Sequence, residues 1–194
     1  MGLFTALFCS YSAQNIEILR LCNILLLCTS YRKLKQDFWR EIMQTNETLV
    51  GRIEIEDLVK KYCLYFDTNQ PEKLVDLFSE DACIDYGPEV APLHGKSEAF
   101  TMISRGLTNL FAQTSHHISN FILDFDSDDL AHSVSYIYAW HRYQDKEEIG
   151  YLWGQYHHKF TRENGSWKIS DLKLFAVNID NFHRATMHPV DRKQ

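Results

Sequence analysis

Residues 151–179, YLWGQYHHKFTRENGSWKISDLKLFAVNI, contain two runs in which apolar and polar residues alternate. A period of two is typical of a β-strand with one buried face. The dipeptide Asn164-Gly165 separates the runs and favours the tight turn of a β-hairpin, because both residues tolerate a positive φ. The segment therefore predicts two long antiparallel strands, at residues 151–162 and 167–179.

Two further runs of the same period come before this hairpin, at residues 116–125 and 131–143. Short polar segments at residues 126–129 and 144–148 follow them and predict turns. Consecutive strands usually pair with one another. Four such strands in succession therefore predict an antiparallel meander.

The first half of the domain has apolar residues at the helical spacings of three and four. A first helix is predicted from residue 52 to about Asp67, and a second from Pro71, because proline suits the first turn of a helix. A third helix begins at Gly95, and residues 82–86 form a short strand before it. Helices followed by a long antiparallel meander are typical of an α+β fold.

The chain has the composition of a folded protein, with 194 residues of which 45% are hydrophobic and 24% are charged. This length suits one domain with a core of its own. The net charge of −6 argues against nucleic acid or an anionic membrane as a partner, because binding phosphate groups requires positive charge. The aromatic share of 13% is consistent with a large core or with a pocket for a flat apolar ligand.

The first 42 residues differ from the rest of the chain, because they hold more basic than acidic residues while the remainder carries the negative charge. Their apolar run is interrupted by charged residues such as Glu17 and Arg20, so we do not expect it to cross a membrane. We interpret residues 1–42 as a poorly specified extension, with Met43 as an alternative start, and residues 43–180 as the domain.

Five cysteines are present, but neither a CxxC pair nor a regular spacing relates them. Such a pattern is typical of reduced thiols and not of a disulfide framework. We therefore expect a cytoplasmic protein.

A ligand pocket is predicted from aromatic residues that share a face within a strand. They are Tyr136, Tyr138 and Trp140 in one strand, and Tyr156, His158 and Phe160 in another. A curved sheet that presents such faces to helices either encloses a mostly apolar pocket or holds a filled core. The tail, residues 181–194, either folds over the mouth of the pocket or lies on a partner subunit.

Six short segments resemble, in order, those of the SnoaL-like, scytalone dehydratase-like branch of the nuclear transport factor two-like superfamily. They are residues 62–67, 77–86, 94–96, 114–120, 154–156 and 164–169, within a resemblance that covers about residues 52–180. The resemblance implies a conical barrel, with three N-terminal helices packed in a strongly curved, mainly antiparallel sheet. Members of this group often assemble through the sheet, which implies a homodimer or a higher homo-oligomer.

The resemblance also implies a catalytic set of Asp67 at the end of the first helix, Tyr86 after the first strand and His116 early in the meander. Further residues are expected to line the substrate pocket. They are Tyr62, Phe66, Asn120, Tyr136, Tyr156 and His158.

This chain departs from the dehydratase pattern at several of its positions. A tyrosine of the pattern is replaced by Phe66, and the second histidine of the pattern falls closest to Val134. The serine and asparagine of a later strand fall near Gly154 and Tyr156. These departures argue against scytalone itself as the substrate.

Each proposed catalytic residue has a structural alternative. A histidine beside an apolar pocket can move protons near neutral pH, and a tyrosine can polarise a carbonyl. Alternatively, Asp67 only shapes a turn, Tyr86 fills the core and His116 bonds to a backbone carbonyl. Only one of the neighbours His116 and His117 can face inward, because successive strand residues point to opposite faces, and the resemblance favours His116.

We expect no metal site and no cofactor. The histidine pairs 116–117 and 157–158 point to opposite faces of their strands, so neither pair can chelate one ion. The sequence also lacks a glycine-rich phosphate loop and a nucleophile elbow.

These observations predict a cofactor-free lyase or isomerase, similar to a dehydratase, that acts by general acid–base catalysis. Its substrate would be a small cyclic or aromatic hydroxy-carbonyl compound, bound without nucleic acid or membrane. Two alternatives stay open. One is a non-catalytic small-molecule-binding or accessory subunit, similar to a dioxygenase β subunit, and the other is a polyketide cyclase.

Overall fold

The computed structural model describes the backbone of residues 4–192, and side chains between residues 31 and 192 except that of Thr45. No helix among these described residues is long and apolar enough to cross a membrane.

The chain forms two compact units that divide between Leu49 and Val50. Helix α1 (Phe4–Asp67) contributes to both units. In the first unit, the described side chains of α1 are almost all exposed, whereas the second unit holds the hydrophobic core. The predicted domain boundary between residues 42 and 43 stays a prediction.

The second unit contains the end of α1 together with α2 (Pro71–Val75) and α3 (Gly95–Asn109). Helix α1 stops at Asp67, as predicted, and Asn69 then takes a positive φ of 53° that turns the chain. Pro71 begins α2 in the first-turn position that suits it. Buried residues of all three helices join one core cluster with the inner face of the sheet.

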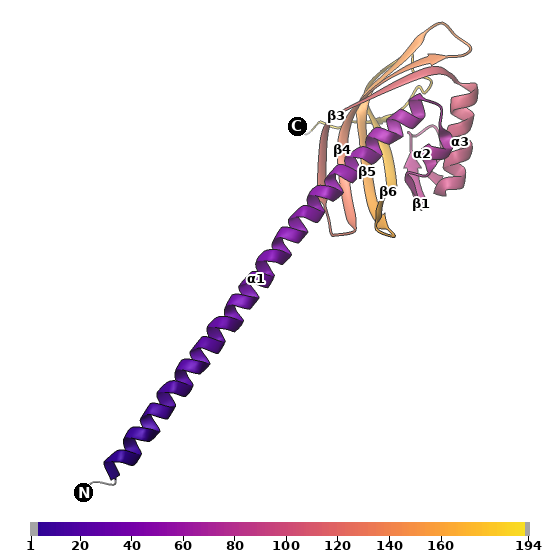
Figure 1. Cartoon of the computed structure of the whole chain (residues 1–194). Helices are drawn as coiled ribbons and strands as arrows, with labels where there is room; N and C mark the ends of the chain where they lie inside the picture. Colours follow the sequence, from indigo (N-terminus) through magenta and orange to yellow (C-terminus); the bar gives the residue numbers. More distant parts are fainter. Residues whose placement is uncertain (1–3, 193–194) are drawn as a thin grey trace. The chain divides into compact units, whose positions relative to one another are not determined.

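A curved, unclosed sheet with strand order β2-β1-β6-β5-β4-β3 packs against these helices, and β7 pairs with β6 (Figure 1). Its strands are β1 (Phe78–Asp85), β2 (Leu93–His94), β3 (Phe111–Phe125), β4 (Leu130–Tyr143), β5 (Ile149–Glu163), β6 (Ser166–Asp180) and β7 (His188–Pro189). The pairs β1–β6 and β6–β7 are parallel, and the other pairs are antiparallel. The predicted α+β class, with helices packed against a curved and mainly antiparallel sheet, is confirmed.

The hairpin between β5 and β6 turns at the predicted dipeptide. Asn164 has a φ of 50° and Gly165 a φ of 81°. Two successive positive φ values are characteristic of the turn that matches the twist of the flanking strands. The local chemistry of this dipeptide therefore determines how β5 and β6 pair next to the turn, before the first register irregularity at Lys159 and Phe160.

Two strand boundaries differ from the sequence prediction. Strand β1 begins at Phe78, although Leu77 and Phe78 also continue the helical spacing of the preceding segment. Strand β3 begins at Phe111 and not at residue 116, because the backbone from Phe111 onward already pairs with β4.

The inner face of β4 carries mostly small residues, and the aromatic residues at positions 136 and 138 face outward, whereas Tyr143 at the end of the strand is buried. Ser133, Ser135 and Ala139 are buried, whereas Tyr136 is 44% exposed. On this outer face Tyr138 of β4 contacts two aromatic rings of β5. The predicted inward position of Tyr136 is therefore wrong, because the aromatic register of β4 packs across the outside of the sheet.

Candidate active site

The second unit encloses a cavity of about 420 Å³ beneath α3 and against the inner face of the sheet. Its lining is mostly apolar and aromatic, with a few polar side chains that converge on it. The residues are Tyr62, Phe66, Tyr86, Met102, Ile103, Arg105, Gly106, Asn109, Leu110, Phe111, His116, His141, Tyr156, Leu174, Phe182, His183 and Arg184. The structure thus brings five of the sequence-predicted site residues to one cavity: Tyr62, Phe66, Tyr86, His116 and Tyr156.

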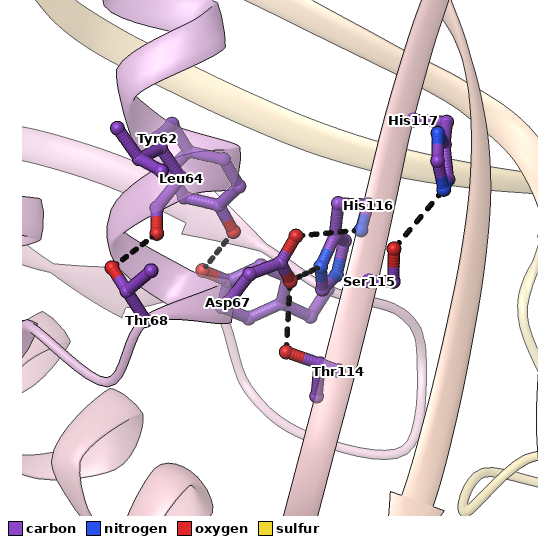
Figure 2. A network of polar contacts seen from close by, with 9 residues as sticks. Tyr62, Leu64, Asp67, Thr68, Thr114, Ser115, His116 and His117 are labelled. Carbon is purple, nitrogen blue, oxygen red and sulfur yellow. Dashed lines mark hydrogen bonds and ion pairs between the residues drawn. The ribbon is translucent and has the colours of Figure 1, made fainter.

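The carboxylate of Asp67 contacts His116 at two points, the ring and the backbone, and Thr114 at a third (Figure 2). Its Oδ1 lies 2.5 Å from His116 Nδ1, and its Oδ2 accepts the backbone N–H of His116 at 2.8 Å. Thr114 Oγ1 donates to Oδ1 at 2.8 Å. This geometry follows from the end of α1 at Asp67, which places the carboxylate directly beside β3.

The same contacts determine the charge of Asp67. Burial raises the pKa of this carboxyl, but the hydrogen bonds and charge of His116, together with the bond from Thr114, outweigh burial and lower the pKa below its ordinary value. An ionised carboxylate only accepts hydrogen bonds, so His116 Nδ1 must carry the proton. The other ring nitrogen, Nε2, belongs to a side chain that lines the cavity, and it is the acceptor when the ring is neutral.

His117 provides the contrast on the same strand. It is exposed, and its Nε2 lies 3.0 Å from Ser115 Oγ, on the opposite face from His116 (Figure 2). The alternation of a strand therefore resolves the choice between the two histidines in favour of His116.

Two tyrosine hydroxyls meet at the cavity wall, since Tyr62 Oη lies 2.8 Å from Tyr86 Oη. Burial raises the pKa of Tyr86 to about 12, and it raises the pKa of Tyr62 well above the ordinary value of 10. Both hydroxyls are therefore neutral at pH 7. Between them they can donate one hydrogen bond to each other and one to a ligand.

A second histidine, His141, also lines the cavity, with its ring centroid 5.3 Å from that of His116. Burial, together with the nearby His116 and His183, lowers the pKa of His141 to about 3, so its ring is neutral at neutral pH. Sequence reasoning missed this residue, because the resemblance pointed to Val134. The alternation of the strand did indicate this residue, because His141 lies two positions after Ala139 on the same inward face and its neighbours on either side face outward.

The tail after β6 folds over the cavity and contributes Phe182, His183 and Arg184 to its lining. Contacts at two places hold it to the end of β1 and to the loop that follows β1. His188 Nε2 lies 2.9 Å from both carboxylate oxygens of Asp85. Thr186 donates to Glu89 Oε1 from its backbone N–H at 2.6 Å and from its hydroxyl at 2.7 Å.

Two predicted pocket residues besides Tyr136 lie elsewhere. Asn120 is exposed and has a φ of 49°, at an irregularity between Ser119 and Ile122 that interrupts the alternation of β3. His158 does face inward, but it is packed between the rings of Tyr156 and Phe160 and does not line the cavity. The first difference arises from a bulge that no sequence period reveals, and the second from core packing.

The comparisons with known proteins agree with this architecture. No curated protein matches the chain. A Novosphingobium aromaticivorans protein, provisionally named a scytalone dehydratase, is 31% identical with a TM-score of 0.73, over 77% of this chain and 99% of its own. Hexachlorocyclohexane dehydrochlorinase LinA-type3 from Novosphingobium barchaimii is 19% identical with a TM-score of 0.65, over 75% of this chain and 98% of its own. ActVI-ORFA from Streptomyces coelicolor is 14% identical with a TM-score of 0.55, over 64% of this chain and 96% of its own.

At identities below 25%, the last two similarities show the fold alone. Residues 47–173, however, match the family described as the SnoaL-like domain, and they include the end of α1, the Asp67–His116 pair and the cavity lining except Leu174 and the tail residues Phe182, His183 and Arg184. The chain therefore belongs to the SnoaL-like domain family.

Proposed function

We propose that this protein is a lyase that removes water from a small cyclic or aromatic hydroxy-carbonyl compound by general acid–base catalysis. The observation that carries the proposal is the Asp67–His116 pair at the wall of a mostly apolar cavity. The name of the Novosphingobium aromaticivorans relative supports this class of reaction.

The first step would be abstraction of a proton from the carbon next to the carbonyl. His116 Nε2 is the base, because Nδ1 already carries a proton that is bonded to Asp67. The ionised Asp67 stabilises the imidazolium that forms and keeps the ring in place. The electron pair moves onto the carbonyl oxygen, where the hydroxyl of Tyr86 can donate a hydrogen bond to the enolate.

The second step would expel the hydroxyl group from the next carbon. The enolate reforms the carbonyl, a carbon–carbon double bond forms, and the departing hydroxide takes the proton held by His116. Water and an unsaturated carbonyl compound leave, and the pair returns to its starting state. His141, whose pKa is about 3, is not a proton source at neutral pH, so His116 serves as both base and acid.

The walls of the cavity set the kind of substrate. The rings of Phe66, Phe111 and Tyr156 offer flat apolar surface, and a volume of about 420 Å³ suits a compound of one or two rings. All groups in this scheme belong to the protein, so the proposed lyase uses no cofactor or metal.

The proposal is tested with 3-hydroxy-1-tetralone, whose dehydration gives fluorescent 1-naphthol. His116→Ala should lower kcat/KM by roughly 10²-fold to 10⁴-fold, as expected for loss of a general base. His117→Ala is the matched control and should leave turnover within about twofold, because this side chain lies outside the cavity. Turnover by His116→Ala at the rate of the unmodified protein would contradict the proposal.

A further inference from the structure

The cavity has a positive charge balance, in contrast to the chain as a whole. The net charge of the protein is −6, yet the described residues that line the cavity include Arg105 and Arg184 and no aspartate or glutamate. Among the described residues, the carboxylate of Asp67 is already engaged by His116 and Thr114, and that of Glu89 accepts two hydrogen bonds from Thr186. A ligand that fills this space therefore meets two arginines that no described carboxylate contacts directly.

Arg184 is the better placed of the two arginines, because it is half-buried whereas Arg105 is exposed. Among the residues that the structure describes, none forms a hydrogen bond or ion pair with the Arg184 guanidinium. Glu89 acts on it only through its longer-range charge, and Oε1 of Glu89 accepts both hydrogen bonds from Thr186. A half-buried guanidinium without a partner is costly, because desolvation is not offset by an ion pair.

Arg184 also lies close enough to Tyr86 for each to affect the ionisation of the other. The positive charge of Arg184 lowers the pKa of Tyr86, although burial of the hydroxyl outweighs this effect. Both side chains line the same cavity as His116. The tyrosine hydroxyl and the guanidinium thus both offer hydrogen-bond donors to a ligand in this cavity.

We propose that the substrate of this cavity carries a carboxylate, which binds Arg184 while its apolar ring lies among the aromatic walls. The planar guanidinium can donate two parallel hydrogen bonds to a carboxylate, which favours this group over a neutral amide of the same shape. The inference deepens the proposed function, because it names the substrate class of the same cavity. The inference rests on the proposed function only for the reaction that the bound substrate undergoes, and the binding of a carboxylate does not depend on it.

Binding without turnover tests the inference directly. The probes are 2-naphthoate and 2-naphthamide, which share a ring system and differ in charge, and the full chain is titrated with each by calorimetry at pH 7. The unmodified protein should bind naphthoate more tightly than naphthamide. Arg184→Gln should weaken naphthoate binding by roughly 10-fold to 100-fold, the range expected for a charge-assisted hydrogen bond, and leave naphthamide binding unchanged.

Two further variants complete the test. Arg184→Lys keeps the positive charge but loses the planar guanidinium. Its affinity for naphthoate should therefore lie between that of the unmodified protein and that of Arg184→Gln. Arg142→Gln removes the same charge from the exposed face of β4, where it donates to Gln113, and should bind naphthoate as the unmodified protein does. Unchanged naphthamide binding shows that Arg184→Gln keeps its fold.

Three results would overturn the inference: equal affinity for the two probes, no naphthoate binding at millimolar concentration, or equal losses of both probes in Arg184→Gln. Because no bond is broken in this measurement, its outcome is independent of whether His116 is a base. A carboxylate preference that depends on Arg184 can be observed even if the protein does not dehydrate the test substrate. Dehydration can likewise be observed in a protein that does not prefer a carboxylate, so the two proposals fail separately.

Discussion

The carboxylate of Asp67 connects the end of α1 to strand β3. It accepts hydrogen bonds from the side chain and backbone of His116 and from the hydroxyl of Thr114. A neutral amide at this position could donate as well as accept, so it would no longer select the tautomer with a proton on Nδ1. Asp67 is therefore a positioning residue that determines how His116 presents Nε2 to the cavity.

Asp67→Asn should lower kcat by roughly 10²-fold or more with little change in KM. The amide can still hold the imidazole ring in place, but it no longer selects the tautomer with a proton on Nδ1 and no longer stabilises the positive charge of the imidazolium. The measurement is steady-state turnover of 3-hydroxy-1-tetralone over a range of pH. A merely structural role would instead reduce the fraction of folded protein and leave kcat per folded molecule intact.

Sequence reasoning succeeded at residues whose position follows from an element boundary or from alternation. Asp67 ends a helix, Tyr86 follows a strand, and His116 faces inward where its neighbour cannot. It missed Arg184, because an irregular tail has no period from which an inward side chain can be recognised. Asn120 was misplaced because a bulge shifts the register locally.

Among the elements, the tail contacts residues on both sides of Tyr86. His188 forms a hydrogen bond with Asp85 at the end of β1, and Thr186 donates to Glu89 in the loop that follows. Burial raises the pKa of Asp85, but its hydrogen bonds, that of His188 foremost, outweigh burial and lower the pKa. The tail that carries Arg184 is thereby fixed to the same loop as the hydroxyl of Tyr86.

Asp85→Asn should loosen the tail and accelerate amide hydrogen exchange in residues 182–190 by roughly tenfold, the effect of losing one charge-assisted hydrogen bond. Exchange is followed by mass spectrometry at pH 7. His188→Ala should have a similar effect, and the double variant should exceed Asp85→Asn only slightly, because both changes remove the His188–Asp85 contact and Asp85 also contacts Gly87 and Lys173. Asp171→Asn on β6 is the control, and unchanged exchange in Asp85→Asn would contradict the assignment.

The long elements were predictable because their patterns repeat over many residues. The four strands of the meander and the hairpin at Asn164-Gly165 have a clear period of two and strong turn chemistry. The two-residue strands β2 and β7 are too short to have a period. The aromatic register of β4 was misread because large apolar residues usually mark the core, whereas here they pack against β5 on the outside.

At the scale of the whole molecule, buried neutral histidines make stability depend on pH. Burial lowers the pKa of His158 to about 3, while the unfolded chain keeps the ordinary value of about 6.5. Between these values the unfolded state binds a proton that the folded state does not. The free energy of unfolding should therefore fall as the pH decreases from about 6.5 toward 3, by at most about 1.4 kcal/mol per pH unit for each such histidine.

His158→Leu should flatten this dependence, because a side chain of similar volume replaces a group whose ring nitrogens lack hydrogen-bond partners among the described residues. The measurement is urea unfolding at pH 5 and at pH 7.5. The gain in unfolding free energy should be larger at pH 5 than at pH 7.5. His117→Leu, at an exposed position, should keep the original slope, and parallel pH profiles for His158→Leu and the unmodified protein would refute the explanation.

The outer face of the sheet presents aromatic side chains to solvent, with Tyr138 36% and Trp153 39% exposed in the single chain. Contiguous exposed apolar surface of this kind favours association, so we propose that copies of the chain assemble through this face. Tyr138→Ser combined with Trp153→Ser should shift the mass measured by light scattering toward that of one chain. An unmodified protein that already runs as a monomer at micromolar concentration would contradict this proposal.

In the proposed reaction, His116, held by Asp67, removes a proton from carbon. The most direct measurement is the exchange of the C2 protons of 1-tetralone in deuterium oxide, followed by NMR, because this ketone has no leaving group and isolates the first step. We expect the unmodified protein and His117→Ala to accelerate exchange, and His116→Ala to slow it by roughly 10²-fold or more. Exchange by His116→Ala as fast as by the unmodified protein, or no acceleration over buffer by either, would contradict the account.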